Sequence, residues 1–361
     1  PEQYALDHAR VPERVIVATE SYPIDSFSNW QLVWQNNFLI GDFVWTAFDY
    51  IGESALGANG KYSPDVEDCD SYCAQPWSFH LAFCGDLDIV GHLRPLSYFR
   101  NVLWHVSLLE MAVHAPSPIG EAESVAEWGW PDERQSWTWS TFNSRSTSSS
   151  TYGASMLTVN IYTRATSVQL LVNEKSLGFR NVSDATQLTA TFDVQYQPGR
   201  ITAIGYDDKG VEIASRSFTT AHPSVAISLA VDKNVLQASD PDDVAFISAW
   251  LVDARGVVNP EEAHALTFTI VKGEAYEAGI EIIATGNADP TDVSSFETKS
   301  CSTYRGTCVA VLSPTGLKQP GHGNAEVGSN FREGEKDVCS VRIISVSALG
   351  LRPGQISVLL C

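Results

Sequence analysis

The sequence lacks any long apolar run and has few basic residues for its length. No stretch reaches the roughly 20 apolar residues that span a bilayer, and residues 1–10 have neither the basic start nor the apolar core of a signal peptide. Lys and Arg number 23 against 43 Asp and Glu, a formal net charge of −20 over 361 residues. Such a charge repels nucleic acid and anionic lipid. The sequence therefore predicts neither a nucleic-acid nor a membrane partner, and it favours a neutral small-molecule substrate.

Residues that could bind a metal are also sparse. Cys69 and Cys73 are closely spaced, but no second pair and no neighbouring His complete a zinc set. We expect no metal and no cofactor. The seven cysteines are an odd number, so at least one thiol is unpaired within the chain. The compartment stays open, because the sequon Asn181-Val182-Ser183 would matter only in a secreted protein. The start at Pro1 rather than Met suggests a fragment or a processed chain.

The N-terminal third is typical of α/β structure. Val15–Thr19 and Phe43–Trp45 are predicted strands with an amphipathic stretch between them, and a helix is predicted from Pro95 to Trp104. A strand, helix, strand, loop and helix in this order match the end of a parallel repeat. We therefore expect residues 1–115 to be the C-terminal portion of a (β/α)₈ TIM barrel.

From about residue 116 the pattern changes to short alternating runs separated by turn residues. Pro198-Gly199 and Asp207–Gly210 are turn signals within one such series. A second series restarts at Val225, just after His222-Pro223. Two immunoglobulin-like β-sandwiches are predicted, over 116–222 and 223–361. The non-periodic stretch from Thr315 to Lys336 is predicted to be a surface insertion with weak order.

Glu20 comes directly after the first predicted strand. The carboxyl ends of strands present the active-site groups of barrels and open α/β sheets. On position alone, a carboxylate that caps the helix near Pro23 is an equally good interpretation.

The residues around Glu20 also carry a family resemblance. Val15–Pro23 resembles the nucleophile strand of glycoside hydrolase family 2, and Ile40–Glu53 is similar to its last barrel strand and following loop. Cys84–Gly91 and Arg94–Arg100 resemble the family's final loop and helix. Two further segments, Leu171–Gly178 and Gly286–Pro290, resemble turns in the accessory sandwiches of the family's β-galactosidase branch.

The resemblance implies a retaining glycosidase of the β-galactosidase type, with Glu20 as the nucleophile that forms a glycosyl ester. It implies that Trp45 is a floor for the sugar, although a Trp buried between strand and helix is the alternative. Asp49 would bind a sugar hydroxyl or hold the loop. Asp86 and Asp88 would line the site or cap loops. The family's acid/base precedes the nucleophile by more than the nineteen residues present here, so we expect it to be absent and the fragment to be inactive.

Two further features bear on the sandwiches. Trp128, Trp130, Trp137 and Trp139 could form a glycan-binding platform, but alternating Trp137 and Trp139 are expected to fill a core or a contact with the barrel. Glu174 stands where the family usually has Gly after Asn173, which would strain a left-handed turn.

Two functions remain open. The first is a hydrolase acting on a β-linked oligosaccharide or glycoside; galactosidases, glucuronidases and mannosidases share this barrel, so the sugar stays open. The second is a non-catalytic truncated product that serves as an accessory or carbohydrate-binding module. In either case an incomplete barrel leaves strand edges unpaired, so the partner would be the missing N-terminal part or a second copy in a homo-oligomer.

Overall fold

The computed structural model describes residues 2–62, 75, 77–139, 156–240, 242–271, 279–315 and 340–361. The pair Cys69 and Cys73, and nearly all of the expected insertion from Thr315 to Lys336, lie outside these residues. Contacts divide the chain into two compact units, Pro1–Thr220 with Pro290–Val293, and Ala221–Asp289 with Ser294–Cys361. The described part of the chain contains no helix that is both long and apolar enough to cross a membrane.

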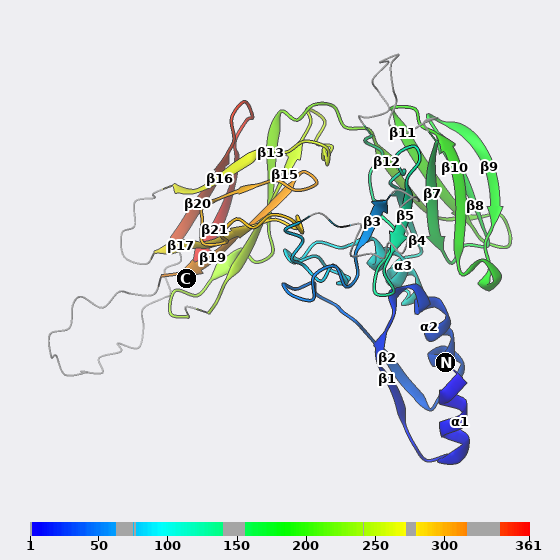
Figure 1. The fold of residues 1–361 in the computed structure, drawn as a ribbon. Coiled ribbons are helices and arrows are strands. Elements are labelled where there is room, and N and C mark those ends of the chain that lie inside the picture. Colours follow the sequence, from blue (N-terminus) through cyan, green and yellow to red (C-terminus); the bar gives the residue numbers. More distant parts are fainter. Residues whose placement is uncertain are drawn as a thin grey trace. The chain divides into compact units, whose positions relative to one another are not determined.

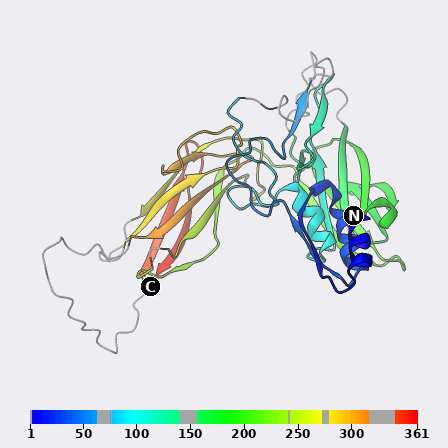
Figure 2. The same cartoon turned by 60° about the horizontal axis from the view of Figure 1, so that its bottom comes forward.

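The first unit begins with a parallel β-α-β unit. Its elements, with a leading helix, are α1 (Glu2–Arg10), β1 (Ile16–Ser21), the 3₁₀ turn η1 (Pro23–Asp25), α2 (Ser26–Gln35) and β2 (Leu39–Val44). β1 pairs with β2 in parallel, and α2 packs against β2. In Figure 2 the N-terminal helices, in blue, lie beside the strands of the same colour. Among the described residues no other parallel pair is joined through a helix. Where the sequence predicts the end of a barrel, the structure therefore contains a single β-α-β unit. Two strands cannot close a barrel by themselves.

Helix α3 (Pro95–Leu103) joins this unit to the sheets that follow. Pro95 stands at the first helical position, where its missing N–H costs no hydrogen bond. Eight of its nine residues are buried, packed against β4 (Leu109–His114) and the neighbouring strand β7 (Met156–Thr163). At the C-terminal end of α3, Arg164 donates from Nε to the carbonyl oxygen of Val102 at 2.7 Å. The helix is thus fixed to the sheet by packing and by a side-chain cap.

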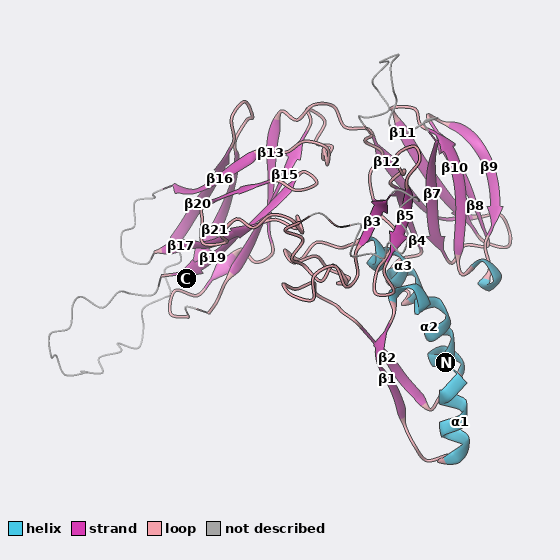
Figure 3. Cartoon of the chain, viewed as in Figure 1, coloured by secondary structure: helices cyan, strands magenta, loops and turns pink. Residues whose placement is uncertain are grey.

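Two four-stranded antiparallel sheets form the first β-sandwich (Figure 1). Their orders are β10-β7-β4-β6 and β12-β11-β8-β9. The remaining strands are β6 (Glu133–Arg134), β8 (Ser167–Val172), β9 (Lys175–Asn181), β10 (Thr189–Gln195), β11 (Arg200–Tyr206) and β12 (Glu212–Thr219), with the 3₁₀ turn η3 (Asp184–Thr186). Within the part of the chain that the structure describes, the three α-helices all precede residue 104, and the residues after them are mainly strands and loops (Figure 3). The predicted predominance of β-strands after the N-terminal third is confirmed.

Strand β4 differs from the sequence expectation. Residues 109–114 fall within the segment expected to belong to the barrel, yet β4 is a central strand of the sandwich sheet, paired with β7 and β6. Met111 and Val113 point into the sandwich core, while Ala112 faces α3 on the other side. Both faces of β4 are therefore covered by apolar side chains, one by the sandwich core and the other by α3. The sequence pattern of such a strand does not show to which domain it belongs.

The sandwich core contains the two expected tryptophans. Trp137 is fully buried and Trp139 nearly so, and both belong to the cluster that fills the space between the sheets. The indole Nε1 of Trp137 donates to the carbonyl oxygen of Gln197 at 2.9 Å. The prediction that these two side chains fill a core is confirmed, and neither forms a surface platform.

The turn between β8 and β9 has the conformation expected from its position. Asn173 and Glu174 both have positive φ, at 49° and 67°, as a two-residue hairpin turn with matching twist requires. Asn tolerates this left-handed conformation well, because its short side chain can form a local hydrogen bond. In Glu the Cβ comes close to the following carbonyl oxygen, and no such hydrogen bond offsets the strain.

We expect Glu174→Gly to stabilise the first unit by about 0.5 kcal/mol, since the strain relieved exceeds the extra chain entropy of glycine. Urea unfolding should show a higher midpoint with an unchanged slope. Lys175→Gly, at the first residue of β9, is the matched control and should destabilise. A lower unfolding midpoint for Glu174→Gly would show that Glu174 does not strain this turn.

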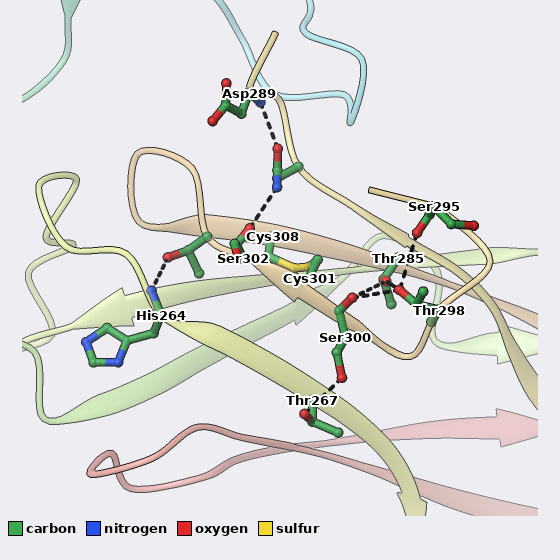
Figure 4. Close-up of a disulfide and its surroundings, with 12 residues drawn as sticks. His264, Thr267, Thr285, Asp289, Ser295, Thr298, Ser300, Cys301, Ser302 and Cys308 are labelled. Carbon is green, nitrogen blue, oxygen red and sulfur yellow. Dashed lines mark hydrogen bonds between the residues drawn. A yellow bond between two sulfur atoms is a disulfide. The ribbon is translucent and has the colours of Figure 1, made fainter. Parts of the chain in front are cut away.

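The second unit is a sandwich of its own, with sheets β13-β15-β19-β17 and β14-β21-β20-β16-β18. Its strands are β13 (Ala226–Val231), β14 (Val235–Leu236), β15 (Ala245–Val252), β16 (Ala265–Val271), β17 (Ile280–Gly286), β18 (Ser300–Ser302), β19 (Thr307–Pro314), β20 (Ser340–Ser347) and β21 (Gly354–Leu360). A disulfide joins Cys301 of β18 to Cys308 of β19 (Figure 4), seven residues apart. It therefore links the short edge strand β18 of one sheet to β19 of the other.

Candidate active site

The candidate site lies at the carboxyl edge of the β1–β2 pair. Glu20 is the last residue but one of β1, and Trp45 follows directly after β2. Ser21 pairs with Val44, so the residue next to Glu20 is aligned with the residue next to Trp45. Because the two strands are parallel, both residues lie at the same edge. Glu20 is exposed and Trp45 is partly buried, which leaves the carboxylate accessible to a ligand.

The loops that follow β2 are held together by backbone hydrogen bonds. The segment after Trp45 runs beside residues 81–87, with bonds from Thr46 N to Cys84 O at 3.3 Å and from Asp49 N to Leu87 O at 2.9 Å. Bonds in the reverse direction run from Ala82 N to Tyr50 O and from Leu87 N to Ala47 O. The peptide bond between Trp45 and Thr46 is cis. The edge that carries Trp45 is therefore part of an ordered loop pair rather than a free loop.

The side chain of Asp49 is buried within this loop pair. Its side chain is 1% exposed, and its Oδ1 accepts hydrogen bonds from the backbone N–H groups of Phe83 and Cys84, at 2.8 and 3.3 Å. Its Oδ2 lies 3.8 Å from Nη1 of Arg94. Of the two interpretations that the sequence left open, this geometry favours the loop-holding role over contact with a sugar hydroxyl.

Asp86 and Asp88 are likewise engaged within the protein. Asp86 forms a two-bond ion pair with Arg100 of α3, with Nε to Oδ2 at 2.6 Å and Nη2 to Oδ1 at 3.3 Å. Burial raises the pKa of Asp86, and the Arg100 charge opposes that rise. Asp88 accepts from the backbone N–H groups of Val90 and His92. These contacts favour loop capping over lining the site for both carboxylates.

Cys84 is the free cysteine among the described residues, and it is fully buried within the loop pair. Burial, and after it the charge of Asp49, raises the pKa of the thiol to about 11. At neutral pH the group is therefore a protonated thiol, which is a poor nucleophile. Glu20 is thus a better candidate than Cys84 for nucleophilic chemistry at this edge.

Aromatic rings follow one another along the edge. Trp45 meets Tyr50 edge-on, with ring centroids 6.1 Å apart, and it meets Trp128 at 6.5 Å. Trp128 in turn packs on Tyr22 at 4.3 Å. Burial, and then the hydrogen bond to Glu53, raises the pKa of the Tyr50 hydroxyl far above its ordinary value, so it stays protonated. We call Tyr22, Trp45, Tyr50 and Trp128 the aromatic wall.

Trp128 and Tyr22 were not predicted as site residues. The cluster of four tryptophans, which the sequence treated as a group, divides in three: Trp137 and Trp139 enter the core, Trp128 joins the aromatic wall, and Trp130 packs on Phe99 of α3. The indole Nε1 of Trp130 donates to the buried carboxylate of Glu133 at 3.0 Å. The strand pattern could have separated Trp128 from Trp137 and Trp139, because Trp128 lies in a turn that precedes these alternating tryptophans.

No group of three or more His, Cys, Asp or Glu side chains suited to a metal occurs within the described residues.

Comparisons with known proteins bear on both the edge and the sandwiches. Residues 227–328 match the family model "Glycoside hydrolase family 2 C-terminal domain 5", and residues 154–214 match a domain of unknown function, DUF4982. The curated Beta-galactosidase BoGH2A of Bacteroides ovatus is 24% identical over 287 residues, which cover 79% of this chain. A family 2 glycosyl hydrolase structure from Bacteroides cellulosilyticus is 27% identical, with a TM-score of 0.77 over 100% of the chain. These matches support membership of glycoside hydrolase family 2.

The similarity to family 2 structures extends to the β-α-β unit as well as to the sandwiches. A second family 2 structure from Bacteroides cellulosilyticus is 26% identical, with a TM-score of 0.71 over 99% of the chain. This chain spans 27% of the length of the curated relative, and 41% and 39% of the two structures. Much of each family 2 relative therefore has no counterpart in these 361 residues.

Proposed function

We propose that this chain is the C-terminal part of a retaining glycoside hydrolase of the β-galactosidase type, with Glu20 as its nucleophile. In this proposal β1, α2 and β2 are the last elements of a (β/α)₈ barrel, and the two sandwiches are immunoglobulin-like accessory domains. The observation that carries it is the accessible carboxylate of Glu20 at the same parallel-strand edge as Trp45, in a family 2 chain.

The exposed apolar side chains around β1 and β2 support the barrel assignment. Val15 is 64% exposed, Ile40 69% and Phe43 63%. A parallel strand pair is normally covered on both faces, so exposed apolar side chains on it indicate that covering elements are missing. The barrel strands and helices of the longer relatives would cover these side chains, so the proposed partner of this surface is the upstream part of the same protein. A homo-oligomer is the other partner that the sequence left open.

The proposed reaction has two steps. The carboxylate of Glu20 attacks the anomeric carbon while the bond from that carbon to the leaving oxygen breaks, and the leaving oxygen takes a proton from an acid. A water molecule then attacks the glycosyl ester, giving up its proton to the same group, and releases the sugar with retained configuration. That acid/base residue would lie about 5–5.5 Å from Glu20. We assign it to the chain upstream of residue 1.

Covalent labelling tests the nucleophile directly. The natural chain extended upstream through the full barrel should react with 2-deoxy-2-fluoro-β-galactosyl fluoride, whose leaving group needs no acid. Mass spectrometry of the digest should place the sugar on the peptide containing Glu20. Residues 1–361 alone should show no turnover of nitrophenyl β-galactoside, since a positioned acid contributes about 10²–10⁴-fold and the barrel that positions Glu20 is incomplete.

Each result has a distinct consequence. A label on another carboxylate would disprove the assignment of Glu20. Turnover by residues 1–361 alone would show that the acid lies within them. Labelling of neither chain would favour the second candidate, a non-catalytic accessory or carbohydrate-binding module.

A further inference from the structure

Trp128 is an unexpected member of the aromatic wall because it comes from outside the β-α-β unit. It lies in the segment Ala126–Gly129, between β5 (Ala122–Val125) and β6. Its ring packs on Tyr22, two residues beyond Glu20, and meets Trp45, directly after β2. Trp128 is partly exposed, so part of its ring is not covered by protein. One side chain thus contacts residues from both strand ends that form the candidate site.

The backbone around Trp128 is held tightly against the loop after β2. Ala126 N donates to Ala58 O at 3.0 Å, and Gly129 N donates to Ala126 O at 2.8 Å. A Cβ on Gly57 would come within 2.6 Å of the carbonyl oxygen of Trp128, and a Cβ on Gly129 within 2.7 Å of the carbonyl oxygen of Gly57. Only glycine fits at both positions, because no real side chain tolerates such contacts.

The pairing of β3 (Asn59–Tyr62) with β5 adds to this attachment. Asn59 is paired with Val125, and Lys61 with Glu123, in an antiparallel ladder. Lys61 Nζ also lies 2.9 Å from Oε1 of Glu123. Trp128 therefore follows a strand that is hydrogen-bonded to the site loop, and its ring is placed by the same contacts that order that loop.

A preorganised, partly exposed indole that contacts both strand ends of the candidate site suits contact with a pyranose or an aryl ring. Aromatic faces pack on the apolar C–H faces of sugars and on other rings. Trp45 follows β2 directly at the edge that carries Glu20, whereas Trp128 reaches this edge through its contacts with Tyr22 and Trp45. We propose that Trp128 binds the leaving group of the glycoside whose anomeric carbon reacts at Glu20. This inference rests on the proposed function and assigns a specificity role within it.

Two substrates with the same sugar separate this role from general positioning. Nitrophenyl β-galactoside has a ring as its leaving group, and β-galactosyl fluoride has none. In the chain extended through the full barrel, Trp128→Ala should lower kcat/KM for the nitrophenyl substrate about three- to tenfold, mainly through KM. It should change kcat/KM for the fluoride by less than about twofold. Trp128→Phe, which keeps a ring and tests the case in which the alanine variant does not fold, should lie between.

Trp104→Ala is the matched control. Trp104 is 41% exposed at the end of α3 and packs on Trp30 of α2 rather than on the aromatic wall. We expect Trp104→Ala to leave kcat/KM unchanged for both substrates. An equal loss on both substrates in Trp128→Ala and Trp128→Phe, or no loss on either, would overturn the inference. Activity of Glu20→Gln equal to that of the parent would overturn the proposed function itself, whereas a confirmed nucleophile with no discrimination at Trp128 would overturn this inference alone.

Discussion

Replacing Glu20 by glutamine in the chain extended through the full barrel should lower kcat for nitrophenyl β-galactoside by a factor on the order of 10⁴ or more. The amide has nearly the same shape but is a poor nucleophile, so the glycosyl ester does not form. Glu20 is exposed, and substitution of an exposed residue changes stability by no more than about 0.5 kcal/mol. Steady-state kinetics with a thermal unfolding measurement on the same sample will separate the two effects.

Glu13→Gln is the matched control for this variant. Glu13 is an exposed carboxylate a few residues before β1, and we expect its substitution to leave both kcat and stability unchanged. A loss of less than tenfold in Glu20→Gln would disprove the role of Glu20 as nucleophile. Glu20→Ala offers an independent check, because azide should enter the space left by the carboxylate and give a glycosyl azide of inverted configuration.

Replacing Asp86 by alanine should destabilise the first unit by about 3–5 kcal/mol. The substitution leaves the guanidinium of Arg100, whose side chain is 5% exposed, buried without its carboxylate. Urea unfolding monitored by tryptophan fluorescence would measure the loss. Asp7→Ala is the matched control, because it removes a carboxylate that is 43% exposed and pairs with Arg10 and Arg14, whose side chains are 65% and 41% exposed. Exposed pairs of this kind contribute less than about 1 kcal/mol.

The same variant decides between the two roles of Asp86. If the carboxylate only holds the loop against α3, the folded fraction of Asp86→Ala in the chain extended through the full barrel should keep the KM of the parent for nitrophenyl β-galactoside. A stability loss below about 1 kcal/mol together with a KM raised more than tenfold would instead assign Asp86 to the substrate.

Elements whose sequence signal is local could be predicted well. The helix from Pro95 was expected to end at Trp104, and α3 ends at Leu103 with Trp104 as its C-cap. Its proline start and its apolar periodicity are both contained in nine residues. The turn at Pro198-Gly199 lies between β10 and β11, as predicted. In these cases the residues that determine the conformation are also the residues that adopt it.

Features that depend on distant partners could not be predicted. Asn59–Tyr62 has no strand pattern of its own, and it becomes β3 only because residues 122–125 lie beside it. The position of Trp128 depends on the close approach of Gly57, some seventy residues earlier in the chain. The burial of Asp49 likewise depends on the loop at Phe83 and Cys84. A carboxylate in a motif has the same sequence signal whether its oxygens face a ligand or a backbone.

The pairing of β3 with β5 limits how this protein can be divided. A cut after residue 115, where the strand–helix pattern ends, would remove the partner of β3, the ring of Trp128 and the neighbour of β4 in one step. The strand end that carries Glu20 and the first sandwich are therefore not interchangeable modules. Exchange of accessory domains between relatives of this chain would preserve the site only if the junction lay after the first sandwich, beyond β12.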